Sequence, residues 1–127
     1  MTNVNQSLGK KVWAFAAGHI PFYSTGTEPA FTSHDKIAIL NTGDVTAEIV
    51  IKIFYDDSDE VEMSPIFVGS RRLRKIRFND LVNPLPVPLD KPYGFILTSS
   101  ENVVVQFSRM NTGAPACAMI CTNAYPS

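Results

Sequence analysis

The sequence predicts an all-β fold, a single-domain antiparallel β-sandwich of about eight short strands with two long loops. Three observations favour this class. Apolar residues alternate at period two in several short segments, no window of 11–18 residues has a helical period, and turn residues separate the segments. Gly and Pro together supply 7 + 9 = 16 of the 127 residues, which suits short strands and turns better than long helices.

The first half of the chain contains three predicted strands. Val12–Ala16 is the first, and Gly18 follows it closely. Lys36–Asn41 is the second, and Ala47–Tyr55 is the clearest, because alternate residues from Ala47 onward are apolar. The turn residues Thr42–Asp44 between the last two predict a hairpin or a close antiparallel pair.

A second hairpin is predicted around Gly69 and Ser70, which separate the strands Ile66–Val68 and Leu73–Phe78. Within Leu73–Phe78 the apolar alternation slips from one face to the other. A β-bulge there would restore one buried face.

A third hairpin is predicted to join Phe95–Ser99 to Val103–Ser108 through the polar residues 100–102. Ala118–Tyr125 is expected to be the closing strand. Two long stretches, 18–35 and 79–92, are rich in prolines or glycines and are expected to be functional or interface loops.

The chain is expected to be one domain, 1–127, with residues 1–11 forming a flexible N-terminal segment. That segment lacks the apolar core of a signal peptide, and no stretch approaches 18 apolar residues. A cytoplasmic location is therefore expected. The net charge of −1 argues against nucleic acid as a partner.

The most distinctive charged feature is a basic run that holds five of the eleven positive charges, Arg71, Arg72, Arg74, Lys75 and Arg77. On a strand, Arg72 and Arg74 would share one face while Lys75 and Arg77 share the other. One interpretation is a surface that binds a phosphate, a carboxylate or an acidic partner. The other is a solvated strand face paired with the acidic run between Asp56 and Glu62.

Two other groups of residues allow both a structural and a functional interpretation. Asn79 and Asp80 follow the basic strand and would either start a turn or present an amide and a carboxylate to a hydroxylated ligand. Trp13 is the only tryptophan, and its ring would either pack in the core or form a platform for a sugar.

Catalytic and metal signatures are weak. The neighbours Ser33, His34 and Asp35 imitate a catalytic triad, but triad members converge from distant chain positions. The two histidines and two cysteines lack the spacing of structural zinc sites. We therefore expect no catalytic activity, no cofactor and no metal, although a small hydrolase or isomerase using His34 or Asp80 is a weaker alternative.

Several stretches taken together resemble the sensory rhodopsin transducer family. They comprise Trp13–Pro21, Glu28-Pro29 with Phe31 and Ser33-His34, Ile39–Asn41 with Gly43-Asp44, Arg71-Arg72, Arg77–Leu81, the prolines 84, 86 and 88, and Val104–Gln106 with Ser108-Arg109. The similarity runs in the same order over about residues 12–125. This collinearity makes it more specific than any single motif.

The resemblance implies a β-sandwich that assembles as a homotetramer without known catalysis, and a role in relaying a signal from a membrane photoreceptor. It also implies a possible small-molecule ligand, such as a sugar or a related metabolite. The candidate ligand-binding positions that it marks are Trp13, His34, Asn41, Arg71, Arg72, Arg77, Asn79, Asp80, Gln106 and Arg109.

This chain departs from the family pattern at two positions. Ala17 stands where the pattern has an acidic residue, and Lys75 stands where it has a histidine. Either change would retune a ligand site or a receptor contact. Two functions are therefore carried forward, a binding and signalling domain for a sugar-like or anionic metabolite and an adaptor that docks on a membrane photoreceptor or another protein through its basic strand.

Overall fold

The computed structural model describes residues 8–20, 34–111, 118–123 and 125–126. Within these residues the chain forms nine strands and one turn of 3-10 helix, in the order β1 (Lys10–Gly18), β2 (His34–Asn41), β3 (Ala47–Tyr55), β4 (Val61–Glu62), β5 (Ile66–Val68), β6 (Arg72–Arg77), η1 (Phe78–Asp80), β7 (Tyr93–Asn111), β8 (Ala118–Asn123) and β9 (Tyr125–Pro126). The strand pairings are antiparallel, which confirms the predicted all-β class. β1 begins inside the segment 1–11 that we expected to be flexible.

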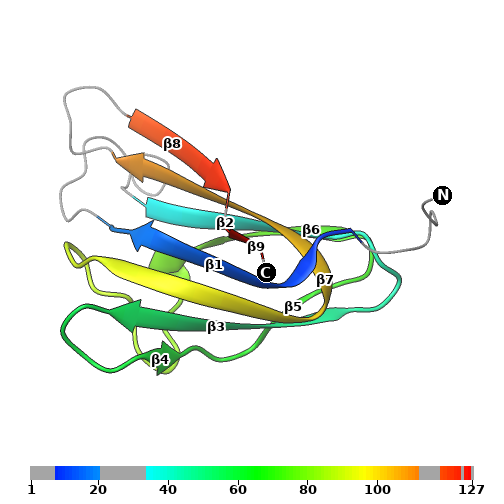
Figure 1. The fold of residues 1–127 in the computed structure, drawn as a ribbon, viewed down its shortest axis with the longest axis horizontal. Coiled ribbons are helices and arrows are strands. Elements are labelled where there is room, and N and C mark those ends of the chain that lie inside the picture. The colour runs from blue at the N-terminus through cyan, green and yellow to red at the C-terminus, as the bar shows by residue number, and fades with distance from the viewer. Residues whose placement is uncertain (1–7, 21–33, 112–117, 124, 127) are drawn as a thin grey trace.

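The strands form two layers that share the long strand β7 (Figure 1). The first layer has the order β4-β3-β7-β1-β9, with β5 also paired to β3. The second layer contains β6, β2, β7 and β8. Residues 93–99 of β7 pair with β3 in the first layer, whereas residues 104–110 pair with β2 in the second. The two layers are therefore one antiparallel sheet that curls over at the middle of β7.

The predicted hairpin at residues 100–102 is wrong, because β7 runs through it as a single strand of 19 residues. The register with β1 jumps between Lys10↔Val103 and Val12↔Thr98, so this part of β7 bulges. The Ser100 hydroxyl accepts a hydrogen bond from the backbone N–H of Glu48 at 2.9 Å. The polar run therefore marks where the strand bends between layers and not where the chain reverses.

The other two predicted hairpins are also wrong, since each turn joins strands of different layers. β2 lies in the second layer and β3 in the first, so Thr42–Asp44 connects the layers. β5 pairs with β3 while β6 pairs with β2, so residues 69–70 make a second connection of the same kind. Turn residues predicted the bends correctly, but the pairing partners lie elsewhere in the sequence.

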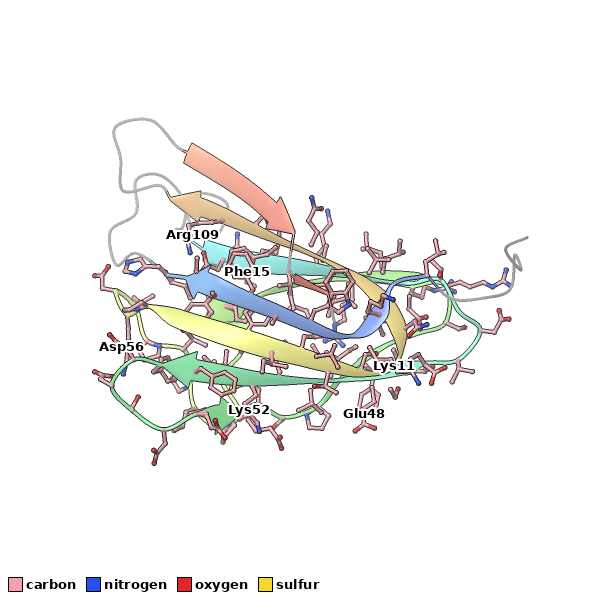
Figure 2. All side chains as sticks on the ribbon, viewed as in Figure 1. Lys11, Phe15, Glu48, Lys52, Asp56 and Arg109 are labelled. Carbon is pink, nitrogen blue, oxygen red and sulfur yellow. The ribbon has the colours of Figure 1, made fainter. Side chains whose placement is uncertain are left out.

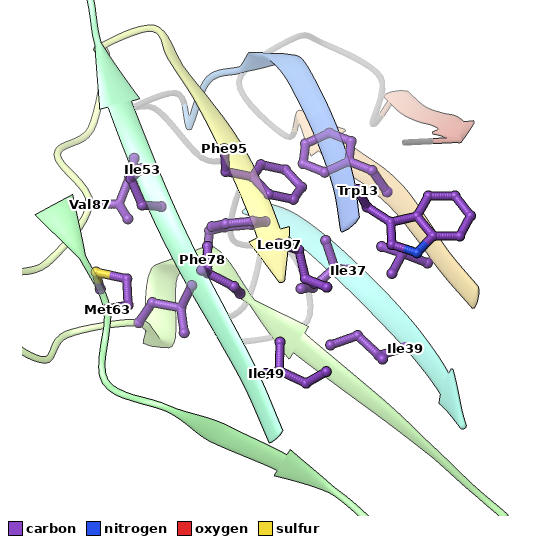
Figure 3. Close-up of a cluster of buried hydrophobic side chains, with 14 of the residues drawn as sticks. Trp13, Ile37, Ile39, Ile49, Ile53, Met63, Phe78, Val87, Phe95 and Leu97 are labelled. Carbon is purple, nitrogen blue, oxygen red and sulfur yellow. The ribbon is translucent and has the colours of Figure 1, made fainter. Parts of the chain in front are cut away.

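The hydrophobic core fills the space between the layers (Figure 3). Alternate residues of β2, β3 and β7 point inward, which confirms the period-two interpretation of these strands. The inward side chains labelled in the figure are mostly aliphatic, with Trp13, Phe78 and Phe95 supplying aromatic rings. On the outer face of β3, by contrast, Glu48 and Lys52 extend toward solvent (Figure 2).

Phe78 closes the core from η1 and not from a strand, so the predicted strand Leu73–Phe78 ends one residue early. Its ring centroid lies 4.9 Å from that of Phe95 and 5.3 Å from that of Tyr93. The predicted bulge is wrong, because β6 pairs with β2 in a continuous register from Arg72 to Arg77. Leu73 consequently points outward and is 56% exposed.

Candidate functional site

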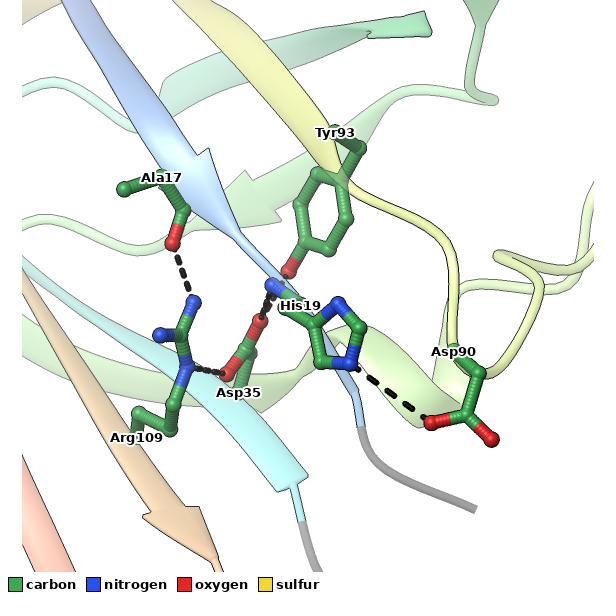
Figure 4. A network of polar contacts seen from close by, with 6 residues as sticks. All are labelled: Ala17, His19, Asp35, Asp90, Tyr93 and Arg109. Atoms are coloured by element: carbon green, nitrogen blue, oxygen red, sulfur yellow. Dashed lines mark hydrogen bonds and ion pairs between the residues drawn. The ribbon is translucent and has the colours of Figure 1, made fainter.

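The most developed polar cluster lies at one end of the sandwich and contains Asp35, Tyr93 and Arg109 (Figure 4). Each of the three lies at the end of an inward-facing row of side chains. The row of β2 contains Asp35, and the row at the start of β7 contains Tyr93. Arg109 lies near the end of β7, directly opposite Asp35 in the register. Because these strands follow the core alternation, the fold itself brings the three side chains together.

The Asp35 carboxylate is fully buried and accepts three hydrogen bonds. Its Oδ1 accepts from Arg109 Nε at 2.9 Å, and its Oδ2 accepts from the Tyr93 hydroxyl at 2.7 Å and from the His19 backbone N–H at 2.8 Å. Arg109 also donates to the carbonyl oxygen of Ala17. A buried charge needs such partners, so the cluster stabilises the junction of β1, β2 and β7.

Burial and the adjacent Asp35 charge raise the pKa of Tyr93 far above its ordinary value of 10.0. The phenol therefore remains a proton donor to Asp35 over the whole physiological range. His19 contributes its backbone to this cluster, while its Nε2 lies 3.5 Å from Asp90 at the surface. The groups of the cluster hydrogen-bond to each other and to the backbone, so the cluster has a structural role.

Asn41 secures the two turns that connect the layers. Its side-chain N–H groups reach the carbonyl oxygens of Val45, Val68 and Gly69 at 2.9, 3.2 and 3.2 Å. Its Oδ1 accepts from the Gly43 backbone N–H at 3.0 Å. One buried amide thus joins both connections, which gives this candidate ligand-binding residue a structural role.

Arg71 and Trp13 also contact the fold's own groups. Arg71 has a positive φ of 54° and binds Asp44 Oδ1 through Nε and Nη2, both at 2.9 Å. Trp13 is 7% exposed, and its Nε1 donates to the carbonyl oxygens of Lys10 and Val103. Trp13 therefore packs in the hydrophobic core, as one of its two interpretations predicts.

The basic strand β6 has the predicted alternation, with Lys75 opposite Ala38 and Arg77 opposite Lys36 on the outer face. Arg74 lies on the other face and donates to the carbonyl oxygen of Phe67 at 2.8 Å. β6 belongs to the second layer, whereas the acidic run follows β3 in the first. The two runs therefore lie in different layers of the sandwich.

The remaining candidate residues lie at several places in the fold, and only Asn79 and Asp80 are neighbours in the chain. Arg72 lies at the exposed start of β6, and Gln106 lies opposite Ala38 on the outer face of the second layer. Asn79 is half-buried in η1, and Asp80 borders a small hollow of about 180 Å³ with Ser64 and Asn83. The side chain of His34 lies outside the described part of the structure. The nine candidates with described side chains do not gather around one hollow.

Three larger hollows lie on the outside of the first layer and its loops. Two of them, of about 400 and 370 Å³, are on the outer face of β1, β3 and β7 and share Phe54 and Ile96. The third, of about 410 Å³, lies between the turn after β3 and the proline-rich loop 85–91. None of the nine candidates whose side chains the structure describes lines any of these three hollows. Sequence reasoning missed them because each is formed by residues distant in the chain.

Within the described residues, no group of three or more His, Cys, Asp or Glu side chains is placed to hold a metal ion. In the same residues, no helix is long and apolar enough to cross a membrane. Asp35 and Tyr93 are the important polar residues that our candidate list omitted. The sequence indicated both of them, because Asp35 precedes Ile37 by two residues and Tyr93 precedes Phe95 by two. Each polar residue therefore lies on the same strand face as a core residue.

Comparisons with known proteins agree with the fold. Residues 8–126 match the profile of a family described as Anabaena sensory rhodopsin transducer. The crystal structure of Thermotoga maritima 1070 is similar with a TM-score of 0.79 and 30% identity, covering 94% of this chain and 96% of that one. The Anabaena sensory rhodopsin transducer is similar with a TM-score of 0.72 and 40% identity, covering 80% and 95%. No curated protein matches the chain.

Proposed function

The chain belongs to the Anabaena sensory rhodopsin transducer family, and from this premise we propose that it is a non-catalytic, cytoplasmic signalling adaptor that docks on a membrane photoreceptor or a related receptor. The family is not known for catalysis. The observation that most favours an adaptor is the location of the polar groups inside the fold and of the larger hollows on its surface. The side chains of Asp35, Asn41 and Arg109 form hydrogen bonds within the protein itself, while the larger hollows open on the outer surface.

Binding to nanodiscs tests this function directly. The probe is the Anabaena sensory rhodopsin in nanodiscs, with empty nanodiscs of the same lipids as the control. The adaptor function predicts saturable binding to the loaded nanodiscs alone. Equal binding to both preparations, or binding to neither, would contradict docking on this class of receptor.

Small-molecule binding is the second candidate function, and the hollow beside Asp80 is the observation that favours it. Ser64 and Asn83 border the same hollow and could hydrogen-bond a hydroxylated ligand. Its volume of about 180 Å³ is below the ~300–1,000 Å³ of ordinary ligand pockets. Thermal-shift screening with sugars, sugar acids and phosphate tests it, with Asp80→Ala as the variant that should abolish any rise in melting temperature.

Self-association is part of the proposal, because the family resemblance implies a homotetramer. The apolar outer face of the first layer supports it, since Ala14, Ala16, Phe54, Gly94 and Ile96 border one continuous hollow there. Light scattering after size exclusion should give four times the chain mass of 14.0 kDa. A monomer at all concentrations would exclude the tetramer.

A further inference from the structure

The hollow between the turn after β3 and the loop 85–91, which we name the acidic groove, is lined by both apolar and charged residues. Its volume is about 410 Å³, and it is lined by Tyr55, Ser58, Asp59, Glu60, Val61, Leu85, Pro86, Pro88 and Lys91. Figure 2 shows the neighbouring Asp56 at this end of β3, with Glu48 near the opposite end of the strand. The groove is therefore a local feature of one end of the first layer.

The apolar part of the groove suits an inserted side chain. Tyr55 and Val61 are half-buried, while Leu85 on the opposite wall is 58% exposed. Pro86 and Pro88 have no backbone N–H, so this wall offers a partner carbonyl acceptors but few donors. A bound segment would therefore have to bring its own donors, together with an apolar side chain to cover Leu85.

The charge around the groove is negative. The segment from Asp56 to Glu62 holds five acidic residues, and Lys52 and Lys91 are the two cations paired with it, which leaves a net charge of 2 − 5 = −3. Lys52 pairs with Glu60 at 3.7 Å. A concave surface of one sign with low-dielectric walls attracts the opposite charge.

The groove already holds one ammonium group of its own chain. The Lys91 Nζ lies 2.6 Å from Asp57 Oδ1, 3.2 Å from the Ser58 hydroxyl and 4.7 Å from the centre of the Tyr55 ring. The pKa of Asp57 is lowered by this contact and that of Lys91 is raised. The Asp57 carboxylate, the Ser58 hydroxyl and the Tyr55 ring face together bind this ammonium group. Two further carboxylates, Asp59 and Glu60, line the groove itself.

We propose that the acidic groove docks an extended basic segment of a protein partner, with an apolar side chain between Tyr55 and Leu85 and flanking Lys or Arg side chains on Asp59 and Glu60. The inference rests on the proposed adaptor function and specifies its contact. Cytoplasmic loops of membrane proteins are enriched in Lys and Arg, so a receptor supplies such segments. The basic strand β6 would repel such segments. Receptor docking is therefore assigned to the acidic groove and not to the basic strand, which was the docking surface expected from sequence.

A peptide titration followed by amide chemical shifts tests the groove. The probe is the peptide Gly-Arg-Leu-Lys-Pro-Leu-Arg-Gly, and the controls carry Glu in place of its cations or Ser in place of its leucines. We expect shifts that cluster at Tyr55, Val61 and Leu85 with the probe alone. Shifts spread over all acidic residues, or no shifts with the probe, would overturn the proposal.

Variants of the protein test the charged and the apolar contacts of the groove separately. Asp59→Asn combined with Glu60→Gln should weaken peptide binding by about 2–25-fold, since each exposed ion pair is worth up to about five-fold. Leu85→Ser should weaken it without changing the net charge. Glu48→Gln removes one acid from β3, near the end of that strand far from the groove, and should leave the affinity unchanged. If the Glu48 variant and the groove variants weakened peptide binding equally, net charge alone would explain the effect. That result would refute the groove as the binding site.

The same variants separate this inference from the adaptor function. If receptor nanodiscs bind the Asp59→Asn/Glu60→Gln and Leu85→Ser variants as tightly as the unmodified chain, the adaptor survives and the groove fails as its docking site. If the basic peptide binds in the groove but receptor nanodiscs do not bind at all, the groove is supported and the photoreceptor partner is excluded. Unchanged melting temperatures would confirm that the variants fold.

Discussion

Replacing Arg109 with methionine tests whether the polar cluster holds the end of the sandwich together. The change removes the Nε–H that donates to Asp35 at 2.9 Å and the donor to the Ala17 carbonyl, while it keeps an unbranched side chain of similar reach. Asp35 is fully buried and would keep only its bonds to Tyr93 and the His19 backbone. A buried carboxylate then loses its compensating charge.

Removing one partner of a buried ion pair costs about 3–5 kcal/mol. We take the lower end, about 3 kcal/mol, because the Arg109 side chain is 23% exposed and water can approach the gap. For 127 residues at about 2.1 cal/mol/K each, the unfolding entropy is roughly 0.27 kcal/mol/K. The melting temperature should therefore fall by about 11 °C.

The assay is thermal unfolding followed by circular dichroism, with Arg71→Met as the matched control. Arg71 makes a similar Arg–Asp contact, but its side chain and that of Asp44 are mostly exposed, so its loss should cost less than about 1 kcal/mol. Adding Asp35→Asn to Arg109→Met should restore part of the stability, because the uncompensated charge is then gone. Equal melting temperatures for the Arg109 and Arg71 variants would refute the reasoning.

The remaining predictions concern ionisation, the connecting turns and assembly. Because the folded pKa of Tyr93 is raised, its contribution to stability is complete below pH about 10 and declines as the pH rises further, and Tyr93→Phe should flatten this decline in alkaline unfolding curves. Asn41→Ala leaves buried carbonyls unsatisfied and should lower the free energy of unfolding in urea by about 1–3 kcal/mol, and an unchanged urea midpoint would contradict its role. The Asp57 carboxyl should titrate below its ordinary pKa of 3.8 by NMR, and Lys91→Met should return it toward that value. Ile96→Arg should dissociate the proposed oligomer in light scattering, while an intact oligomer would place the subunit contact elsewhere.

The alternation of apolar residues predicted the strands well, because every second side chain of a strand points into the core. β3 and β5 have the predicted bounds, Ala47–Tyr55 and Ile66–Val68. The three hairpins were wrong for a common reason, since a polar turn marks a change of direction and carries no information about which distant strand pairs on either side. β7 is the clearest example, because its partners β1, β2, β3 and β8 span most of the chain.

The site was predicted less well than the fold. Arg109 was identified as a candidate, but its partner Asp35 was considered only as a neighbour of Ser33 and His34. The alternation through Ile37 and Ile39 places Asp35 inside the sandwich, where Arg109 from near the far end of the chain neutralises it. The acidic groove depends on two loops about thirty residues apart, whose approach no local pattern describes.

Photo-crosslinking from Leu85 to receptor nanodiscs tests the adaptor and its docking groove most directly. A photoreactive amino acid is placed at Leu85 and, as the control, at Glu48 near the other end of β3. The account predicts a crosslink from Leu85 alone, mapped by mass spectrometry to a Lys- and Arg-rich cytoplasmic segment of the receptor. Equal crosslinking from both positions, or a crosslinked segment without basic residues, would contradict it.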